Sequence, residues 1–245
     1  MSTQNPTVVL VHGAFAESAS WNGVIERLYA QGITSVAVAN PLRSLAGDAA
    51  YLRDVIASVE GPVLLVGHSY GGLVISEASA GNDQVIGLVF VSAFVPSSGD
   101  SAFSLSASAP GSTLGDALDT HDLSGGGVEF VIRRALFRDQ FAADVPVAVA
   151  GLMGATQRPV TEAALRDPAQ ASTPGWADRP TWHVFGSDDR NIPVAVLRAG
   201  ADRADSRGTI EIAGASHAIS VSRPEQVSQT IVTAVRALES AGERV

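Results

Sequence analysis

The chain has 245 residues, of which 46% are hydrophobic and 17% are charged, a composition typical of a packed globular protein. It contains no cysteine, which excludes disulfides, thiolate metal sites and a cysteine nucleophile. A net charge of −9 argues against a nucleic-acid-binding surface, and no apolar run has the length needed to span a bilayer. The first residues, MSTQNPTVVLVHG, lack the pattern of a signal peptide, so we expect a cytoplasmic protein.

Short apolar runs alternate with amphipathic stretches over most of the chain. Residues 7–11 (TVVLV) are apolar and β-branched, which is typical of a strand buried on both faces. Residues 19–31 follow with apolar side chains at helical spacing, and Gly32 is a residue type that ends helices. Further strands are predicted at residues 34–38, 62–66, 85–91, 181–185 and 209–212. Further helices are predicted at residues 48–59, 72–80 and 225–239.

This alternation indicates the fold class. Strands that alternate with helices pair in parallel through right-handed crossovers. We therefore predict an α/β protein with a doubly wound parallel sheet of about six strands and helices on both faces. In such sheets, ligands bind beyond the carboxyl ends of the strands, so the loops that follow the strands are where functional residues are expected.

Residues 96–180 interrupt the alternation between the fourth and fifth strands. Structureless loops of that length are rare in compact domains, and the apolar residues of this stretch argue against disorder. Residues 129–141 and 145–153 have helical patterns. We predict a small helical cap at 96–180, inserted over the strand ends of a core formed by residues 1–95 and 181–245.

The strongest motif for chemistry is GHSYG at residues 67–71, between the strand at 62–66 and the helix at 72–80. A Gly-x-Ser-x-Gly run in this context predicts a sharp turn that raises the serine hydroxyl above the sheet. The serine would also lie at a helix N-terminus, where N–H groups point at developing negative charge. We predict that Ser69 is a nucleophile rather than a structural serine in a tight turn.

A serine nucleophile needs an adjacent base that a third group holds in place. Among five histidines, His217 alone combines a loop position with the carboxyl end of a strand, so we predict it as the general base. The third group must be a carboxylate. The loop after the fifth strand offers two, and we prefer Asp189 to Asp188, which could instead cap the loop. The order Ser69, Asp189, His217 matches one known hydrolase arrangement.

The remaining histidines and the first turn have other expected roles. His12 and His68 are expected to stabilise loops by hydrogen bonds, and His183 to lie in the core or at an edge of the sheet. Acyl transfer also needs N–H donors where oxyanion charge develops. We predict that the N–H groups of Ala14 and Tyr70 form this pair. Phe15 could donate in place of Ala14, or its ring could line the substrate pocket.

Together, HGAF, GHSYG, GSDDRNIP and GASHAISVSRPE resemble the α/β-hydrolase superfamily. The resemblance is to small-cap serine esterases such as bacterial carboxylesterases and plant methyl-salicylate-type esterases. It implies the α/β-hydrolase fold, with Ser69, Asp189 and His217 as the catalytic triad and Ala14 and Tyr70 as the oxyanion hole. Dehalogenases and epoxide hydrolases of this fold use an aspartate where this chain has Ser69. Plant hydroxynitrile lyases keep a lysine beside the catalytic histidine, where this chain has Ala218.

The function expected from these residues is hydrolysis of small, largely apolar carboxylic esters through an acyl-enzyme. No cofactor or metal motif is present, and the expected partner is a small-molecule ester, with the protein a monomer or homodimer and with no membrane partner. A lyase, a C–C hydrolase or a perhydrolase that uses the same triad stays open as an alternative. A non-catalytic protein that binds small molecules in a retained pocket also stays open.

Overall fold

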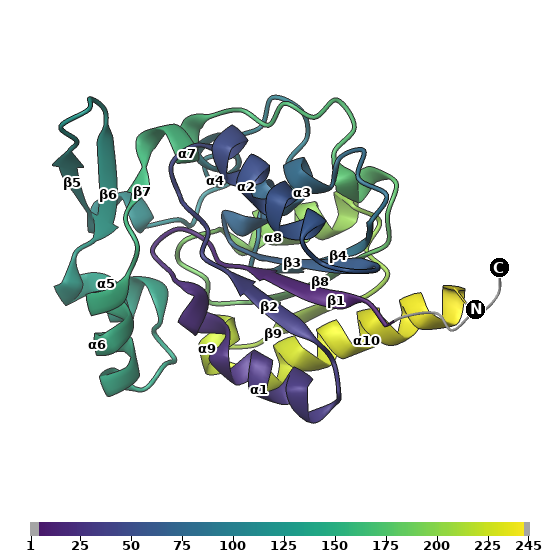
Figure 1. Ribbon diagram of the computed structural model, residues 1–245. Helices are drawn as coiled ribbons and strands as arrows, with labels where there is room; N and C mark the ends of the chain where they lie inside the picture. Colours follow the sequence, from purple (N-terminus) through teal and green to yellow (C-terminus); the bar gives the residue numbers. More distant parts are fainter. Residues whose placement is uncertain (1–4, 243–245) are drawn as a thin grey trace.

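A computed structural model describes residues 5–242 and shows a six-stranded parallel sheet at the centre of the protein (Figure 1). Across the sheet the strands are β2 (Ser35–Val38), β1 (Thr7–Val11), β3 (Val63–His68), β4 (Val85–Val91), β8 (Thr181–Gly186) and β9 (Thr209–Ile212). Every neighbouring pair is parallel. The predicted fold class and all six predicted strands are therefore confirmed, with ends that shift by one or two residues.

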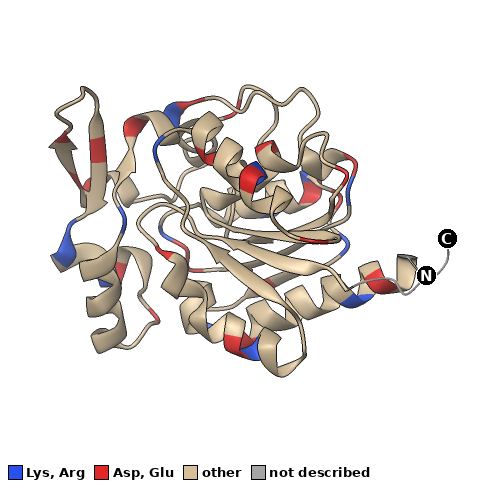
Figure 2. Ribbon diagram, viewed as in Figure 1, with Lys and Arg blue, Asp and Glu red and all other residues tan. Residues whose placement is uncertain are grey.

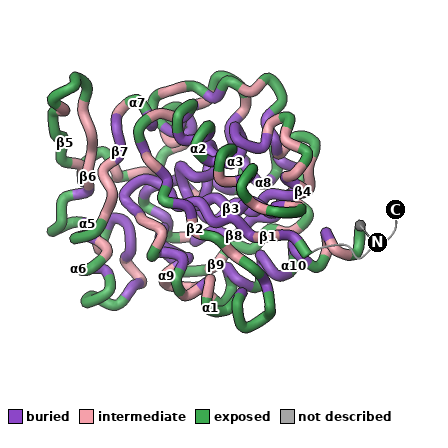
Figure 3. The backbone as a smooth tube through the Cα atoms, viewed as in Figure 1, coloured by how far each residue is buried: buried purple, intermediate pink, exposed green. Residues whose placement is uncertain are grey.

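The alternation of side chains along each strand builds two separate cores. In β1, Val8 and Leu10 are buried on one face of the sheet and Val9 and Val11 on the other. The first face is covered by α1 (Asn22–Ala30), α9 (Ile219–Ser222) and α10 (Pro224–Gly242). The second is covered by α2 (Leu45–Ala57), α3 (Gly71–Ser79) and α8 (Val194–Arg203). Figure 3 shows the buried residues concentrated along the strands between these layers.

Local signals explain where several helices begin and end. Gly32 has φ of +72°, a left-handed conformation suited to glycine, directly after α1 ends. The hydroxyl of Ser44 caps α2 by accepting the N–H of Gly47 at 3.1 Å. Pro224 is the first residue of α10, where its missing N–H costs no hydrogen bond. Helix α8 was not predicted from the sequence.

The segment between β4 and β8 is more varied than the predicted helical cap. It contains α4 (Ala102–Ser106), β5 (Leu118–Asp122), β6 (Val128–Ile132), α5 (Arg134–Phe141), α6 (Val147–Thr156), β7 (Val160–Thr161) and α7 (Glu162–Arg166). Strands β5, β6 and β7 form a separate antiparallel sheet. Figure 1 shows this sheet together with α5 and α6 beyond the end of the central sheet.

One helix prediction in this segment is wrong at its start. Residues 129–132 of the predicted helix at 129–141 belong to β6, and α5 begins at Arg134. The apolar residues there suit a strand as well as a helix, and β5 and β7 supply backbone partners on both sides of β6. The helix predicted at 145–153 is present as α6.

Charged residues lie mostly on helices and loops (Figure 2). Strands β1, β3 and β4 contain none. Within residues 5–242, none of the helices combines the length and the apolar character needed to cross a membrane.

Candidate active site

The turn between β3 and α3 holds Ser69 in a strained backbone conformation. Its φ of +57° is uncommon for a residue with a side chain. The turn packs closely against the loop that follows β1. A Cβ atom at Gly13 would lie 2.6 Å from the Cβ of Ser69, and one at Gly71 would lie 2.6 Å from the carbonyl oxygen of Val11. Glycine at these positions is what allows the two loops to come together at one edge of the sheet.

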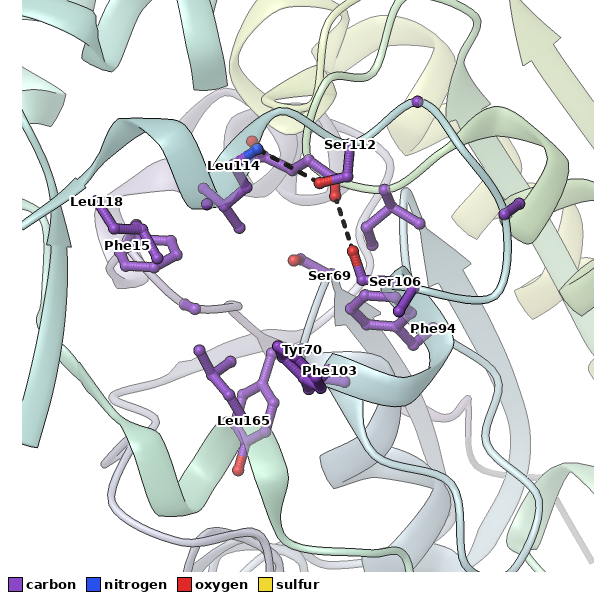
Figure 4. A pocket seen from close by; sticks show the side chains of 18 of the residues that line it. Phe15, Ser69, Tyr70, Phe94, Phe103, Ser106, Ser112, Leu114, Leu118 and Leu165 are labelled. Carbon is purple, nitrogen blue, oxygen red and sulfur yellow. Dashed lines mark hydrogen bonds between the residues drawn. The ribbon is translucent and has the colours of Figure 1, made fainter. Parts of the chain in front are cut away.

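Ser69 lies in the wall of a cavity of about 330 Å³. Figure 4 shows its hydroxyl directed into this space. The hydroxyl forms no hydrogen bond with any residue in the described part of the chain. The strained turn therefore presents an unpaired hydroxyl to the cavity, in a position to contact a bound molecule.

His217 and Asp189 form a buried pair in two neighbouring loops after β8 and β9. The Nδ1 atom of His217 lies 2.6 Å from Oδ2 of Asp189, and both side chains are almost fully inaccessible to solvent. The other carboxylate oxygen accepts the backbone N–H groups of Asn191 at 2.8 Å and Ile192 at 2.9 Å. Asp188 is exposed, and its side chain accepts the hydroxyl of Ser187 instead. The structure thus brings Asp189, and not Asp188, to His217.

His68, the residue before Ser69, joins the turn to His217. Its Nε2 lies 3.1 Å from the carbonyl oxygen of His217, and the two rings are 4.6 Å apart. The ring of Phe141 meets the ring of His217 edge to face at 4.9 Å. Burial lowers the pKa of His68 well below 6.5, so this imidazole is neutral and donates from Nε2. Because His68 carries no charge, it does not repel a positive charge on the imidazole of His217.

The Nε2 atom of His217 is buried and has no hydrogen-bond partner among residues 5–242. With Nδ1 held by Asp189, Nε2 is the nitrogen left for proton transfer. No hydrogen bond joins it to the hydroxyl of Ser69 in this part of the chain. The contact between His68 and His217 nonetheless places the imidazole against the turn that carries Ser69.

The predicted oxyanion donors lie at the same edge of the sheet. Ala14, Phe15 and Tyr70 all line the cavity with Ser69. Phe15 has φ of +60°, a second strained position next to Ser69. Within the described chain, the backbone N–H groups of these three residues donate to no acceptor, so each is available to a bound molecule.

A buried pair that the sequence did not suggest anchors Tyr70. Its hydroxyl donates to Oδ2 of Asp48 at 2.8 Å, and Oδ1 of Asp48 accepts the N–H of Arg43. Burial raises the pKa of Asp48 above its usual value and raises that of Tyr70 well above 10. The pair connects the start of α2 to the residue that follows Ser69, and no spacing in the sequence links the two positions.

The cavity wall is apolar, and among residues 5–242 it carries no charged side chain. The central domain contributes Ala14, Phe15, Ser69, Tyr70, Phe94, Asn191 and Ile192, and residues 102–118 and Leu165 of the inserted segment contribute the rest. Phe103, Leu114, Leu118 and Leu165 surround the space in Figure 4. The inserted segment therefore supplies most of the surface that a ligand would meet.

No histidine, His217 included, is among the described residues that line the cavity. His12 contacts the carbonyl oxygen of Gly13 at 2.9 Å, and burial lowers its pKa to about 4. His183 stacks on Phe90 with ring centres 4.8 Å apart, and burial lowers its pKa to about 3. His121 is exposed on β5. Among residues 5–242, no three histidine or acidic side chains are grouped so that they could hold a metal ion.

Comparisons with known proteins agree with this architecture. The model of the alpha/beta hydrolase family matches residues 8–230. A pyrethroid hydrolase from Sphingobium wenxiniae is 27% identical over 243 residues, which cover 91% of this chain and 85% of that protein. The crystal structure of polyneuridine aldehyde esterase has a TM-score of 0.80 at 20% identity, over 94% of this chain and 99% of that chain. A methylesterase from Arabidopsis has a TM-score of 0.79 at 16% identity, with the same coverage.

Proposed function

Because the chain belongs to the alpha/beta hydrolase family, we propose that it hydrolyses carboxylic esters of small, largely apolar molecules through an acyl-enzyme on Ser69. The observation that carries this proposal is the unpaired hydroxyl of Ser69 in an apolar cavity, together with the buried pair of His217 and Asp189, which contacts the neighbouring residue His68. The relatives support the same class of reaction, since two of them are named as a pyrethroid hydrolase and a methylesterase.

In the proposed first step, Nε2 of His217 takes the proton of the Ser69 hydroxyl while its oxygen attacks the ester carbonyl. Within residues 5–242 no hydrogen bond joins the Ser69 hydroxyl to Nε2, so the proposed transfer requires the two atoms to come together when the substrate binds. Asp189 holds Nδ1 and stabilises the imidazolium that forms. The imidazolium then returns its proton to the leaving alcohol, which leaves an acyl group on Ser69.

The negative charge of the tetrahedral intermediate needs donors on the far side of the carbonyl. We assign this role to the backbone N–H groups of Ala14 and Tyr70, with that of Phe15 as the alternative to Ala14. In the second step, His217 takes a proton from water while the water oxygen attacks the acyl group, and it returns that proton to the oxygen of Ser69 as the acid leaves. The uncharged cavity wall favours uncharged substrates, because a charged group would lose its hydration without gaining a partner.

The test is hydrolysis of a series of p-nitrophenyl esters by the unmodified protein and by Ser69→Ala. We expect the substitution to lower kcat by several orders of magnitude, with the same circular dichroism and thermal unfolding. Ser76→Ala is a matched control, because Ser76 is a buried serine of the neighbouring helix α3, and within the described chain its hydroxyl bonds only to the carbonyl oxygen of Gly72, at 2.7 Å. Equal rates for Ser69→Ala and the unmodified protein would overturn the proposal.

A covalent probe separates an acyl-enzyme from other uses of the same residues. An alkyl p-nitrophenyl phosphonate should add one phosphonyl group to Ser69 and release one nitrophenolate per chain, as measured by mass spectrometry of the peptide that contains it. A protein that binds small molecules without catalysis would show tight, reversible binding of esters and no turnover.

A further inference from the structure

Three polar side chains interrupt the apolar wall of the cavity besides Ser69 and Tyr70. They are Ser106, Ser112 and Asn191. The hydroxyl of Ser106 lies 3.5 Å from the carbonyl oxygen of Asn191, and the N–H of Thr113, next to Ser112, donates to the carbonyl oxygen of Arg190. In the view of Figure 4, Ser106 and Ser112 lie on one side of the cavity, and Phe15 and Leu118 lie on the other.

The orientation of the Asn191 amide follows from its partner Gln140. Nε2 of Gln140 lies 2.9 Å from the carbonyl oxygen of Arg190, which can only accept, so the nitrogen of this amide must face it. The same nitrogen lies 2.8 Å from the near atom of the Asn191 side chain, which must then be Oδ1. Thr113 donates its hydroxyl to the other end of the Gln140 amide, which agrees with this assignment.

With Oδ1 bound to Gln140, the amide nitrogen Nδ2 is the polar atom of the Asn191 side chain that is left to contact the cavity. Within the described chain Nδ2 donates to no acceptor, although Asn191 is only 3% exposed and lines the cavity. A buried amide N–H without an acceptor costs free energy, and nearly all such groups in folded proteins have a partner. Nδ2 is not one of the fully enclosed unpaired atoms of residues 5–242, so it borders the cavity, where either water or a ligand can accept its N–H. A ligand that displaces such a water without offering an acceptor of its own would leave the N–H unpaired.

We propose that Asn191 is a specificity-determining residue, and that the ester hydrolysed by this protein carries a second, uncharged hydrogen-bond acceptor that receives Nδ2–H of Asn191. The acceptor is an oxygen such as that of a ketone or an ether. This inference rests on the proposed esterase function and narrows its substrate class. A carboxylate is excluded as the acceptor, because the cavity wall offers no cation to pair with it.

The experiment compares pairs of esters that differ only in this acceptor. Two pairs of p-nitrophenyl esters place the acceptor in the acyl group. The first compares the 4-oxopentanoate with the 4-methylpentanoate, and the second compares the 5-oxohexanoate with the 5-methylhexanoate. One pair places it in the alcohol, as 3-oxobutyl acetate against 3-methylbutyl acetate. In each pair a carbonyl replaces a branched carbon of similar shape. We expect the keto ester to have a kcat/KM about tenfold higher than its partner in at least one pair.

Asn191→Leu keeps the size of the side chain and removes the donor. It should abolish this preference by slowing the keto ester relative to its partner, whereas general damage to the site would slow both esters equally. Leu165→Ala is the control at an apolar position of the same wall and should change both esters by a similar factor. A preference that survives in Asn191→Leu, or equal rates in all three pairs of the unmodified protein, would overturn the assignment.

Binding to Ser69→Ala keeps this test separate from the proposed reaction. Calorimetric titration with 3-oxobutyl acetate and 3-methylbutyl acetate, and with the methyl esters of the four acids, measures the preference without turnover and with Asn191 unchanged. Preferential binding of a keto ester without hydrolysis by the unmodified protein would contradict the esterase function but support the role of Asn191. Hydrolysis without any preference in rate or binding would support the esterase function but contradict the role of Asn191.

Discussion

The loops that follow the central strands and the segment inserted between β4 and β8 meet at one cavity but are built differently. In the strand-end loops, backbone contacts backbone. A Cβ at Gly186, in the strand that leads to Asp189, would lie 2.2 Å from the carbonyl oxygen of Ala215, in the loop of His217. Over residues 115–154 of the inserted segment, a Cβ at Gly115 or Gly151 would meet no atom within 4 Å, and the nearest atoms to one at Gly154 belong to the side chain of Phe137, at 3.2 Å.

The exposure of apolar side chains differs in the same way. Val147 and Leu152 of α6 are 71% and 69% exposed, whereas Val66 and Val184 of the central strands are fully buried. We infer that the two regions have different roles. The close-packed loops hold the atoms that we propose to react, where small displacements are costly, and the inserted segment, whose helix α6 is more exposed, provides most of the surface that would select the ligand. Substitutions in the two regions should therefore differ in what they change.

The largest expected effect comes from Asp189→Asn. Asparagine can occupy the same space but removes the charge that holds Nδ1–H of His217 and stabilises the imidazolium, so kcat should fall by about 10³- to 10⁴-fold. Leu118→Ala in the cavity wall should instead raise KM and leave kcat within about tenfold. Steady-state kinetics with one p-nitrophenyl ester checks both. A Leu118→Ala enzyme as slow as Asp189→Asn would contradict the different roles inferred for the two regions.

A pair of glycine substitutions tests the packing directly. Gly186→Ala forces a methyl group against the backbone of Ala215, and we expect it to lower the free energy of unfolding by about 3 kcal/mol or to prevent folding. Gly151→Ala, in the exposed middle of α6, should raise it by about 0.5–1 kcal/mol, because alanine loses less backbone entropy in a helix. Denaturant unfolding measures both, and similar losses from the two would show that the regions are equally constrained.

The same difference explains what could be predicted from the sequence. The inner strands β1, β3, β4 and β8 show mostly apolar runs because burial on both faces selects for them, whereas the edge strands β2 and β9 are partly exposed and show weaker patterns. The run GHSYG carries its own turn geometry. The expected meeting of His217 with Asp189 followed from placing each in a loop at the carboxyl end of a strand. Parallel topology brings such loops together whatever their separation in the chain.

The inserted segment offered no comparable signal. Strand β5 (LDTHD) is polar and mostly exposed, so no hydrophobic pattern marks it, and without it β6 could be taken for the start of a helix. The orientation of Asn191 depends on Gln140, 51 positions away. The pair of Tyr70 and Asp48 likewise depends on a contact between α2 and the nucleophile turn. Neither follows from local sequence, because both need the positions of side chains in the folded chain.

A smaller effect is expected when the pH is lowered, because the buried His183 in the central sheet makes the free energy of unfolding depend on pH. Burial lowers the pKa of His183 to about 3 in the folded state, against 6.5 when the chain unfolds. Between these values only the unfolded chain binds the proton, so stability falls as pH falls below about 6.5 and this contribution levels off below about 3. His183→Leu should flatten the dependence of the free energy of unfolding on pH. His121→Leu, on the exposed strand β5, is the control for the loss of an imidazole.

The smallest effect is expected from a substitution where the inserted segment contacts the loop of His217. The carboxylate of Asp144, after α5, accepts the hydroxyl of Ser216, and its Oδ2 lies 3.1 Å from Nη1 of Arg223. The carbonyl oxygen of Phe141 accepts the N–H of Ala218. These contacts hold both neighbours of His217 from the side of the inserted segment. Asp144→Asn keeps an oxygen for Ser216 but loses the ion pair, which is partly exposed, so the free energy of unfolding should fall by only about 1 kcal/mol.

A second ion pair provides a control that separates the positioning of His217 from the stability of the fold. Arg43 and Glu129 also connect the core with the inserted segment, at 2.7 Å, but far from the loop of His217 along the chain. Glu129→Gln should cost a similar free energy of unfolding and leave kcat unchanged, whereas Asp144→Asn should lower kcat by a few fold and leave KM nearly constant, because it loosens the loop that carries the proposed base. Equal kcat values in the two variants would show that the Asp144 contacts stabilise the fold without positioning His217.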